Sequence, residues 1–400
     1  MKSIRAPSTD LETIIPILLG VWRRFQKESG PSDKLQTREF RRVVEAVKIL
    51  EKRHDGKASL VGTDYFDNKE LLGAYILYQW VIHYQQGISL IGELPTVPRR
   101  VLDLCSGASP FAFAALRWGA KEAIAVDRNV NALELGAEIC GRYGMPLTIR
   151  RWDASKRREL PVEGKFDLIV LAHALEDLFP PPGGGNHELG FIRYLMTLLT
   201  PEGHLMLVDD SHPEQNRRIL GLRDALVATG VEVQAPCIWK GECPALKVTN
   251  SPCYAQRQMD KPYMIRELQR AAEINLSSLK MSYIIFKAKN ADSVKENVVK
   301  ENEASEPVEE STAKACYRVI SPAIEGFKGK RHYLCGTGGK KYLESRVPTL
   351  PKEAKAFDYL RRGEVISLEN VFEMQNGIDI IEGSSIKVEA ACGKYFDAGE

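Results

Sequence analysis

The sequence lacks any apolar run long enough to cross a lipid bilayer. A membrane-spanning helix needs about 20 consecutive apolar residues, and every apolar run in this chain is much shorter. The opening residues, MKSIRAPSTD, also lack the apolar stretch found in secretory and mitochondrial leaders. We therefore expect a cytoplasmic protein that does not insert into a membrane.

Cysteine is also scarce, with eight residues in a chain of 400. Folds that depend on disulfides are short and contain much more cysteine. In a chain without a leader we expect these thiols to be reduced, so that some of them are free to bind a metal.

The length and composition predict a globular protein with more than one domain. The chain is 44% apolar and 27% charged, which excludes a wholly disordered, collagen-like or coiled-coil protein. Its net charge of +2 hides an uneven distribution. Residues 291–313 hold seven acids and two lysines, whereas residues 314–363 hold twelve basic residues and four acidic ones. We expect a solvated acidic linker, then a basic module whose charge suits a phosphate backbone.

The chain is predicted to contain three structured parts. The first has apolar residues at helical spacing, and its aromatic helix over 71–84 is expected to pack into the core. In the second, short apolar strands alternate with helices, which predicts a parallel sheet with helices on both faces. The third has short strands with glycine-containing turns, which predicts a β-rich module. The expected boundaries are 1–96 for the helical region, 97–289 for the sheet domain, 290–313 for the linker and 314–400 for the basic module.

One segment of the sheet domain, VLDLCSGASPF, predicts a nucleotide-binding loop between a strand and a helix. Asp103 ends the strand, Gly107 lies in the loop and Ser109 stands where a second glycine is common. The G-x-G-x-x-G pattern of dinucleotide sites is missing. The pattern fits the D-x-x-x-G-x-G motif of S-adenosylmethionine enzymes better.

Acidic residues after the next strands support this interpretation. Asp127 ends the second strand, where a carboxylate can accept both ribose hydroxyl protons, and Asp153 follows the third, where it can accept the adenine amino group. His173 ends the fourth strand, at the mouth where a substrate would lie. Together with Glu176 and Asp177 it is a candidate catalytic residue, although no single base can be assigned.

The order of the last strands is also informative. A reversed strand over 282–287, paired with 231–235, is expected of class I methyltransferases and is absent from dehydrogenases. We therefore predict an α/β protein with a Rossmann-like class I S-adenosylmethionine methyltransferase sheet. A helical N-terminal region and a small β-rich C-terminal module complete the predicted fold.

The fold does not define the chemistry. Enzymes that methylate a base amine often carry an Asn/Asp-Pro-Pro-aromatic loop after the fourth strand, where this chain has AHALEDLFPPPGGGN. A cysteine nucleophile for cytosine methylation is conceivable at Cys237 or Cys253, but a metal site explains these thiols better.

Cys237, Cys243 and Cys253 lie within one insertion, over residues 236–260, with the spacing Cys-x5-Cys-x9-Cys. Thiolates on a short loop rich in proline and glycine can converge on one metal. Cys335 is the first candidate for a fourth ligand, with Cys316 and His332 as substitutes. Ligand count does not separate zinc from iron–sulfur. The irregular spacing and the neighbouring prolines favour iron–sulfur.

The chain also resembles a known family along most of its length, about residues 65–350. The specific part is HLMLVDDSHPEQNRRILGLRDALVATGVEVQAPCIWKGECP, followed by SPCYAQR and LKMSYIIFKA. This run resembles the methyltransferase-like family of small-ribosomal-subunit assembly proteins, known from mitochondrial factors and from bacterial and archaeal relatives.

The resemblance implies S-adenosylmethionine binding and a four-iron four-sulfur cluster on Cys237, Cys243, Cys253 and Cys335. It also implies small-subunit ribosomal RNA as the partner, contacted by the tail. We expect a monomer. Two alternatives stay open: a non-catalytic assembly factor with a degenerate methyltransferase fold, and a zinc-containing methyltransferase of a protein or small molecule.

Overall fold

The computed structural model describes residues 5–54, 65–156, 159–180, 185–249, 252–288, 315–326 and 329–397. The predicted acidic linker lies outside these residues. Within them, no helix combines the length and the apolar character that a bilayer crossing requires.

The N-terminal region is helical, as predicted, and its aromatic helix is buried. Tyr75, Tyr78, Trp80 and Tyr84 are each at most 6% exposed, so these rings fill the core. The elements are α1 (Leu11–Gln26), α2 (Thr37–His54), η1 (Tyr65–Asp67), α3 (Lys69–Ala74), the π-helical turn η2 (Tyr75–Gln79) and α4 (Trp80–Ile91).

The central sheet has eight strands, in the order β3-β2-β1-β4-β5-β8-β6, with β7 paired to β8. The first five strands in this order are parallel, whereas β8 runs antiparallel to β5, β6 and β7. The reversed last strand is therefore present, and the fold is that of a class I methyltransferase. The strands are β1 (Arg100–Leu104), β2 (Glu122–Asp127), β3 (Thr148–Arg151), β4 (Phe166–Ala172), β5 (Leu199–Asp209), β6 (Val233–Ala235), β7 (Ala255–Arg257) and β8 (Leu279–Lys287).

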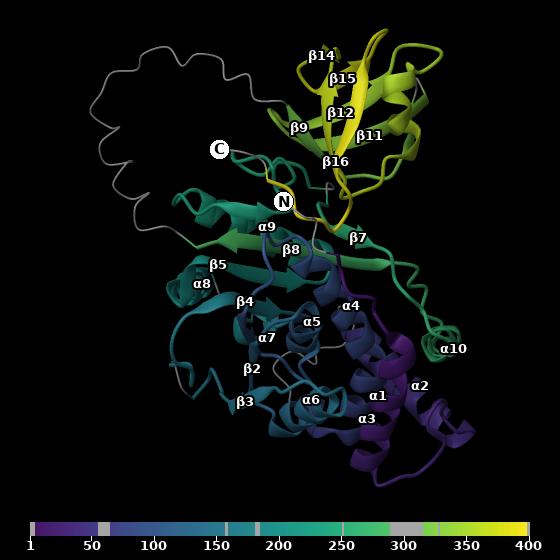
Figure 1. The fold of residues 1–400 in the computed structure, drawn as a ribbon, viewed down its shortest axis with the longest axis vertical. Helices are drawn as coiled ribbons and strands as arrows, with labels where there is room; N and C mark the ends of the chain where they lie inside the picture. Colours follow the sequence, from purple (N-terminus) through teal and green to yellow (C-terminus); the bar gives the residue numbers. More distant parts are fainter. Residues whose placement is uncertain are drawn as a thin grey trace.

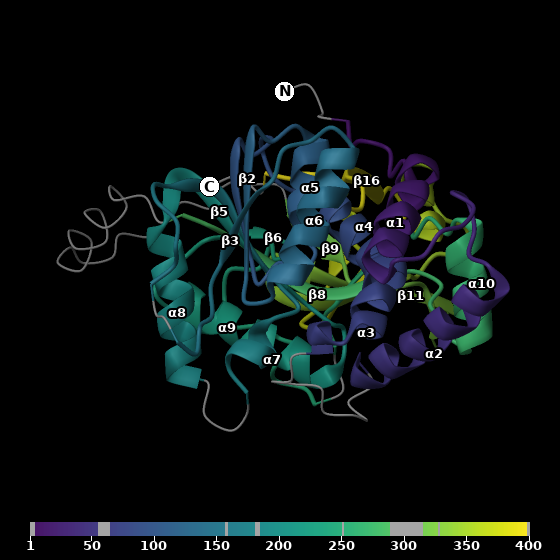
Figure 2. The ribbon, with the colours of Figure 1, turned by 90° about the horizontal axis from the view of Figure 1, so that it is seen from below.

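Helices cover both faces of this sheet (Figure 2). Side chains alternate between the faces along each strand, so Val101 joins one core while Leu102 and Leu104 join the other. The first core includes α4, α5 (Pro110–Trp118) and α6 (Val130–Arg142), and the second includes α7 (Leu175–Leu178), α8 (Gly185–Thr197) and α9 (Pro213–Val227). A further helix, α10 (Tyr263–Ala272), packs against α2.

The C-terminal module, residues 315–397, forms a second sheet with its own core, as the glycine-rich pattern predicts. Figure 1 shows it beside β7, β8 and α9, at the opposite end of the molecule from α1 and α3. Its sheet order is β14-β15-β12-β11-β9-β13-β16, with β10 paired to β11. Its elements are β9 (Cys316–Val319), β10 (Ile324–Gly326), β11 (Gly329–Gly336), β12 (Gly339–Ser345), η4 (Lys352–Tyr359), β13 (Val365–Glu369), β14 (Phe372–Glu373), β15 (Gly377–Ile380) and β16 (Ser385–Ala390).

The three parts of the chain meet at one buried carboxylate, Glu93, which follows α4. It is 1% exposed and accepts hydrogen bonds from Tyr283 Oη at 2.7 Å and Arg257 Nη2 at 2.6 Å. Arg318 of β9 places Nη1 3.5 Å from its other oxygen. The position of the C-terminal module therefore depends in part on the charge of a residue from the N-terminal region.

Replacing Glu93 by Gln should destabilise the protein by about 3 to 5 kcal/mol, because two buried guanidinium groups lose their counter-charge. Urea unfolding followed by tryptophan fluorescence measures this loss. The control is Glu232→Gln, at an exposed pair 3.5 Å from Lys287, which should change stability by less than about 0.5 kcal/mol. Equal effects of the two substitutions would contradict the role given to Glu93.

Candidate functional site

A cavity of about 820 Å³ opens at the carboxyl ends of the parallel strands. This edge of the sheet is where open α/β folds bind ligands. Of the residues that the sequence singles out for the cofactor or for catalysis, its walls contain Asp103, Gly107, Asp127, Asp153, His173, Glu176 and Asp177.

The loop after β1 fixes the carboxylate of Asp127 at the cavity wall. The Gly107 N–H donates to Asp127 Oδ2 at 2.8 Å, and the Asn129 N–H donates to Oδ1 at 2.9 Å. Gly107 has a φ of +54°, and a Cβ there would lie 3.0 Å from the Phe66 ring, so glycine suits the position on both counts. Burial raises the pKa of Asp127, although these two amides oppose the shift.

Ser109 does not line the cavity, which corrects the expectation that it contacts a cofactor. Its side chain is fully buried, and its backbone adopts a φ of +61° at the start of α5. Helix α6 packs closely behind it, because a Cβ on Gly136 would lie 2.8 Å from both Ser109 Oγ and the Ala108 carbonyl oxygen. The serine therefore belongs to the packing of the loop against α6.

The two remaining predicted acids differ sharply in their surroundings. Asp103 is 2% exposed and accepts a hydrogen bond from the Ala112 N–H at 2.8 Å. Burial, with a smaller contribution from Asp127, raises its pKa to about 7. Asp153 bonds to the Ser155 hydroxyl at 2.7 Å and pairs with Lys156 at 3.0 Å, and these contacts lower its pKa to about 2. Much of the carboxylate of Asp153 is thus already engaged within its own turn.

Aromatic side chains form another part of the wall, which the sequence did not reveal. Trp152 is 4% exposed and lies nearly parallel to Phe191, at 6.2 Å between ring centroids and 9° between planes. Phe179 and Tyr194 flank Phe191. The indole N–H of Trp152 is buried and has no hydrogen-bond partner among the described residues.

The N-terminal helices also contribute to the wall, through Phe66, Tyr75, Gln79 and His83. Sequence reasoning missed Phe66, Gln79 and His83, and it favoured core packing over a binding face for the helix that carries Tyr75. A signal was present: Gln79, His83 and Gln86 recur at positions i, i+4 and i+7, which puts these three polar groups on one side of a largely apolar helix. All three are less than 10% exposed.

Those polar groups surround His173. Its Nε2 lies 2.9 Å from Gln86 Oε1, and its ring stacks on His83 at 4.1 Å between centroids. Its Nδ1 lies 3.5 Å from Asp210 Oδ1. Burial, together with Asp210, raises the pKa of the neighbouring Asp209 to about 6.

Helix α9 fixes the backbone of the cysteine insertion. Asn216 donates through Nδ2 to the Cys253 carbonyl at 2.7 Å and accepts from the Cys253 N–H at 3.2 Å. Asp224 accepts from the Cys243 N–H at 2.9 Å. Arg223, which is 1% exposed, donates to the carbonyl oxygens of Trp239 and Gly241.

The structure brings Cys335 of β11 to the three thiols of the insertion. Burial raises the pKa of Cys335, and the thiols of Cys237, Cys253 and Cys243 raise it further by charge repulsion. The turn after Cys335 passes close to the insertion: a Cβ atom added to Gly339 would lie only 3.7 Å from Pro244. The four sulfurs predicted to share a metal are therefore neighbours.

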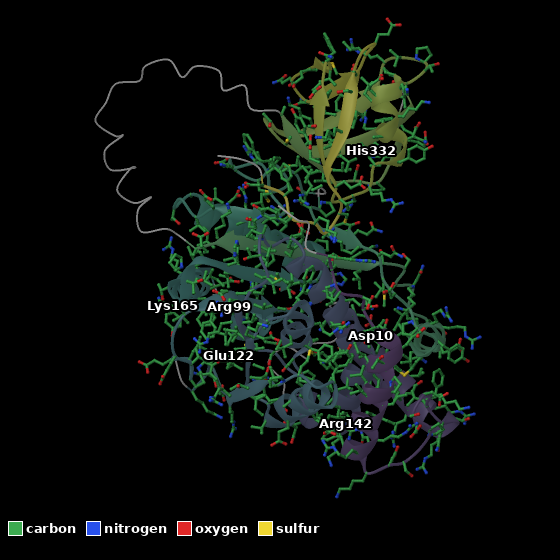
Figure 3. The ribbon with its side chains drawn as sticks, in the orientation of Figure 1. Asp10, Arg99, Glu122, Arg142, Lys165 and His332 are labelled. Carbon is green, nitrogen blue, oxygen red and sulfur yellow. The ribbon has the colours of Figure 1, made fainter. Side chains whose placement is uncertain are left out.

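His332 is not a substitute for Cys335. It is fully buried in the C-terminal module (Figure 3), where Nε2 bonds to the Phe357 carbonyl at 3.0 Å. His332 lies three residues before Cys335 on β11, so the two side chains point to opposite faces of the sheet. Cys140 packs into the core of the sheet domain.

Comparison with known proteins identifies the family. A profile of the family described as mitochondrial small ribosomal subunit Rsm22 matches residues 93–363, which is more than half of the chain. The chain belongs to this family. The Rsm22 match begins at the buried Glu93 and extends into the C-terminal module, so it includes the sheet domain and all four predicted metal ligands.

This Rsm22-family chain is also similar to other proteins. It is 32% identical over 109 residues to the ribosomal protein L11 methyltransferase of Symbiobacterium thermophilum, a match that covers 25% of the chain and 34% of the relative. The chain thus spans about a third of that relative's length.

Two solved structures are more distant. The ribosomal protein L11 methylase of Lactobacillus delbrueckii is 16% identical with a TM-score of 0.32, covering 52% of this chain and 80% of that one. An O-methyltransferase family protein of Burkholderia thailandensis is 12% identical with a TM-score of 0.37, covering 64% and 74%. The fold assignment comes from the strand order described above.

The raised pKa of Asp103 predicts a pH-dependent stability. An unfolded chain ionises this acid near its ordinary pKa of 3.8, but the folded chain does so only near 7. The protonated acid therefore stabilises the folded protein at low pH, and this contribution to the free energy of unfolding is lost as the pH rises through 7. Asp103→Asn cannot ionise, so its stability relative to the native protein should rise by about 2 kcal/mol from pH 5 to pH 8.

Denaturant unfolding at both pH values checks this expectation. Asp153→Asn is the matched control, because a pKa lowered to about 2 affects stability only below the ordinary pKa of an aspartate. Its difference from the native protein should stay constant over the same range. A constant difference for Asp103→Asn as well would show that Asp103 ionises normally in the folded protein.

Proposed function

We propose that this protein binds S-adenosylmethionine in the cavity and acts on small-subunit ribosomal RNA during ribosome assembly or translation. We also propose that its four neighbouring cysteines hold a four-iron four-sulfur cluster. The observation that carries the first proposal is the Asp127 carboxylate, fixed by the Gly107 and Asn129 amides at the wall of a cavity in a class I methyltransferase fold.

The residues of the cavity suit this cofactor. The carboxylate of Asp127 can accept the two ribose hydroxyl protons, and the aromatic wall around Phe191 offers an apolar surface to the adenine. Acidic residues at the other end, Glu176, Asp177 and Asp209, favour a cationic ligand. When bound, S-adenosylmethionine supplies a methyl group on a positively charged sulfur.

Methyl transfer to RNA is the activity that we favour, because the family description names the small ribosomal subunit. The curated relative, a methyltransferase of a ribosomal protein, supports methyl transfer but not the RNA substrate. His173, Glu176 and Asp177 line the part of the wall where a substrate would enter. The role of each in catalysis stays a prediction.

A non-catalytic assembly factor is the alternative, and the missing Asn/Asp-Pro-Pro-aromatic loop favours it. Mapping methylated nucleotides of small-subunit rRNA in a deletion strain separates the two possibilities. Loss of one mark, restored by the native gene, supports the enzyme, and retention of every mark supports the assembly factor.

The spacing of the cysteines favours an iron–sulfur cluster over zinc. Sulfurs bound to one tetrahedral zinc ion lie about 3.8 Å apart, because each Zn–S bond is about 2.3 Å long. Among the described residues, no three cysteine sulfurs lie within 4.8 Å of one another. Wider spacing suits a cluster in which each thiolate binds a different iron. A zinc-containing enzyme for a protein or small molecule is therefore the weaker reading.

The basic surface of the C-terminal module is smaller than its sequence suggests. Arg331, Lys341 and Arg346 pair with Glu344, Glu373 and Asp379, and Arg318 is buried. Two of these acids lie beyond residue 363, outside the segment in which the basic residues were counted.

Exposed basic residues remain at and after η4, although the same turn also carries Glu353 and Asp358. Lys352, Lys355 and the following Arg361 are exposed, and their ion-pair partners are not found among the described residues. Tyr359 beside them is 79% exposed. Cations around an exposed aromatic ring suit a single-stranded RNA segment, because they bind phosphates while the ring stacks on a base. We propose this surface as the RNA contact.

Asp127→Asn should weaken S-adenosylmethionine binding at least tenfold, since it removes one of the two acceptor oxygens and the negative charge. Isothermal titration calorimetry with the full-length protein measures the affinity. Glu134→Gln, on the exposed side of α6, is the control and should bind like the native protein. No binding to the native protein would overturn the proposed cofactor.

Cys243→Ser should remove the brown colour and the iron of anaerobically purified protein, because one of four thiolates is lost. It should also lower the melting temperature, since metal binding contributes to folding. Cys316→Ser is the control and should keep both. A colourless native protein with one zinc per chain would contradict the cluster.

The double substitution Lys352→Glu and Lys355→Glu should weaken binding to deproteinised small-subunit rRNA at least tenfold. The plot of log affinity against log salt concentration should also become less steep, with a slope smaller in magnitude by roughly 1 to 2, because two phosphate contacts are lost. Fluorescence anisotropy at several salt concentrations measures both. The pair Lys121→Glu and Lys280→Glu, exposed on the sheet domain, makes the same charge change and should have little effect.

A further inference from the structure

Three potential metal ligands converge at one end of the cavity. His173 follows β4, and Asp209 and Asp210 end and follow β5, so neighbouring parallel strands deliver them to the same edge of the sheet. One ligand atom from each lies within 4.8 Å of the other two, and no other trio of His, Cys, Asp or Glu side chains in the described part of the chain meets this limit.

The histidine is oriented as a metal ligand would be. The amide oxygen of Gln86 lies 2.9 Å from Nε2 of His173, so a neutral imidazole that donates to it does so from Nε2. The lone pair is then on Nδ1, which has no hydrogen-bond partner among the described residues and faces Asp210 Oδ1 at 3.5 Å. Metal-binding histidines commonly donate their second ring nitrogen to an oxygen in this way.

The backbone of His173 is also constrained. Its φ is +54°, a left-handed conformation that is uncommon for residues other than glycine. The N–H of His173 donates to the Val208 carbonyl at 2.8 Å, which ties the end of β4 to β5. A strained residue that persists in this way is often found at a functional site.

Acidic side chains predominate around the three residues. Asp209 is 6% exposed and adjacent in sequence to Asp210, and Glu176 and Asp177 line the same part of the cavity. On α9, the positive charge of Arg218 lowers the pKa of Asp209. Arg218 is already paired with Glu188 at 2.7 Å. Asp210 is 26% exposed, but two adjacent carboxylates, one of them buried, still repel each other unless a positive charge lies between them.

We propose that His173, Asp209 and Asp210 bind a divalent cation, with two carboxylate oxygens and one imidazole nitrogen as protein ligands. This donor set suits Mn²⁺ and related oxygen-preferring metals rather than the thiolate-preferring ones. Three protein ligands leave coordination positions on the cavity side, where an oxygen of a substrate or a water molecule would bind. The cation site is independent of whether methyl transfer takes place.

Titration of the full-length protein with MnCl₂ tests the proposal, with free Mn²⁺ followed by its electron paramagnetic resonance signal. The native protein should bind one Mn²⁺ per chain at this site. Asp210→Asn and His173→Asn should each weaken this binding at least tenfold. Asparagine is chosen for His173 because it tolerates the left-handed conformation better than other replacements.

Glu159→Gln is the matched control, since it removes a carboxylate from the wall of the same cavity without touching the three ligands. It should bind Mn²⁺ like the native protein. Thermal unfolding of each variant shows whether it is folded, and Asp210, which is 26% exposed, is the position where a substitution is best tolerated.

Absence of Mn²⁺ binding to the native protein, or equal binding by the native protein and both asparagine variants, would overturn the proposal. A separate titration with S-adenosylmethionine distinguishes this failure from that of the proposed function. Mn²⁺ binding without cofactor binding leaves the metal site standing alone, and the reverse result removes only the metal site.

Discussion

The polar side chains of one helix, α9, fix the geometry on which the rest of the molecule depends. Asn216 lies about two turns before the adjacent Arg223 and Asp224 along α9, and all three bond to backbone groups of the cysteine insertion. Backbone groups in a loop without regular structure need such partners when they are buried. Because α9 packs on the central sheet, the insertion takes its position from the sheet, and the C-terminal module in turn meets the insertion at Cys335.

Helix α4 makes a second continuous connection, between the cavity and the junction of the three parts. Near its start, the indole N–H of Trp80 donates to the Ala108 carbonyl at 2.9 Å, which supports the loop that carries Gly107. Gln86 then bonds to His173, and Glu93 follows the helix end at the junction with Arg257 and Arg318. The N-terminal region is therefore part of the site and not only a cover for the sheet.

Local patterns in the sequence were enough to predict much of the fold. Apolar runs of strand length alternating with amphipathic helices gave the parallel sheet, and the reversed last strand is present as β8. The acids at strand ends could be located for the same reason, since parallel strands deliver their carboxyl ends to one edge. The neighbouring positions of four cysteines also agree with the pattern of the insertion.

What could not be predicted depends on contacts between distant segments. Ser109 matched a motif by its position, but the close approach of Gly136 turns it into the core. The cavity wall formed by Phe66 and His83 requires the N-terminal helices to lie against the loop after β1, which no local pattern shows. The basic surface was overestimated because Asp379, a later residue, pairs with Arg346.

The order of the ligands along the chain has a consequence for biosynthesis. Cys237, Cys243 and Cys253 are synthesised before the last strand of the central sheet, whereas Cys335 follows in the second sheet. The complete set of four thiols therefore exists only after translation has passed the linker and β11 has formed. A polypeptide that ends early would carry three of the thiols and lack the fourth, so a filled site would distinguish finished molecules from truncated ones.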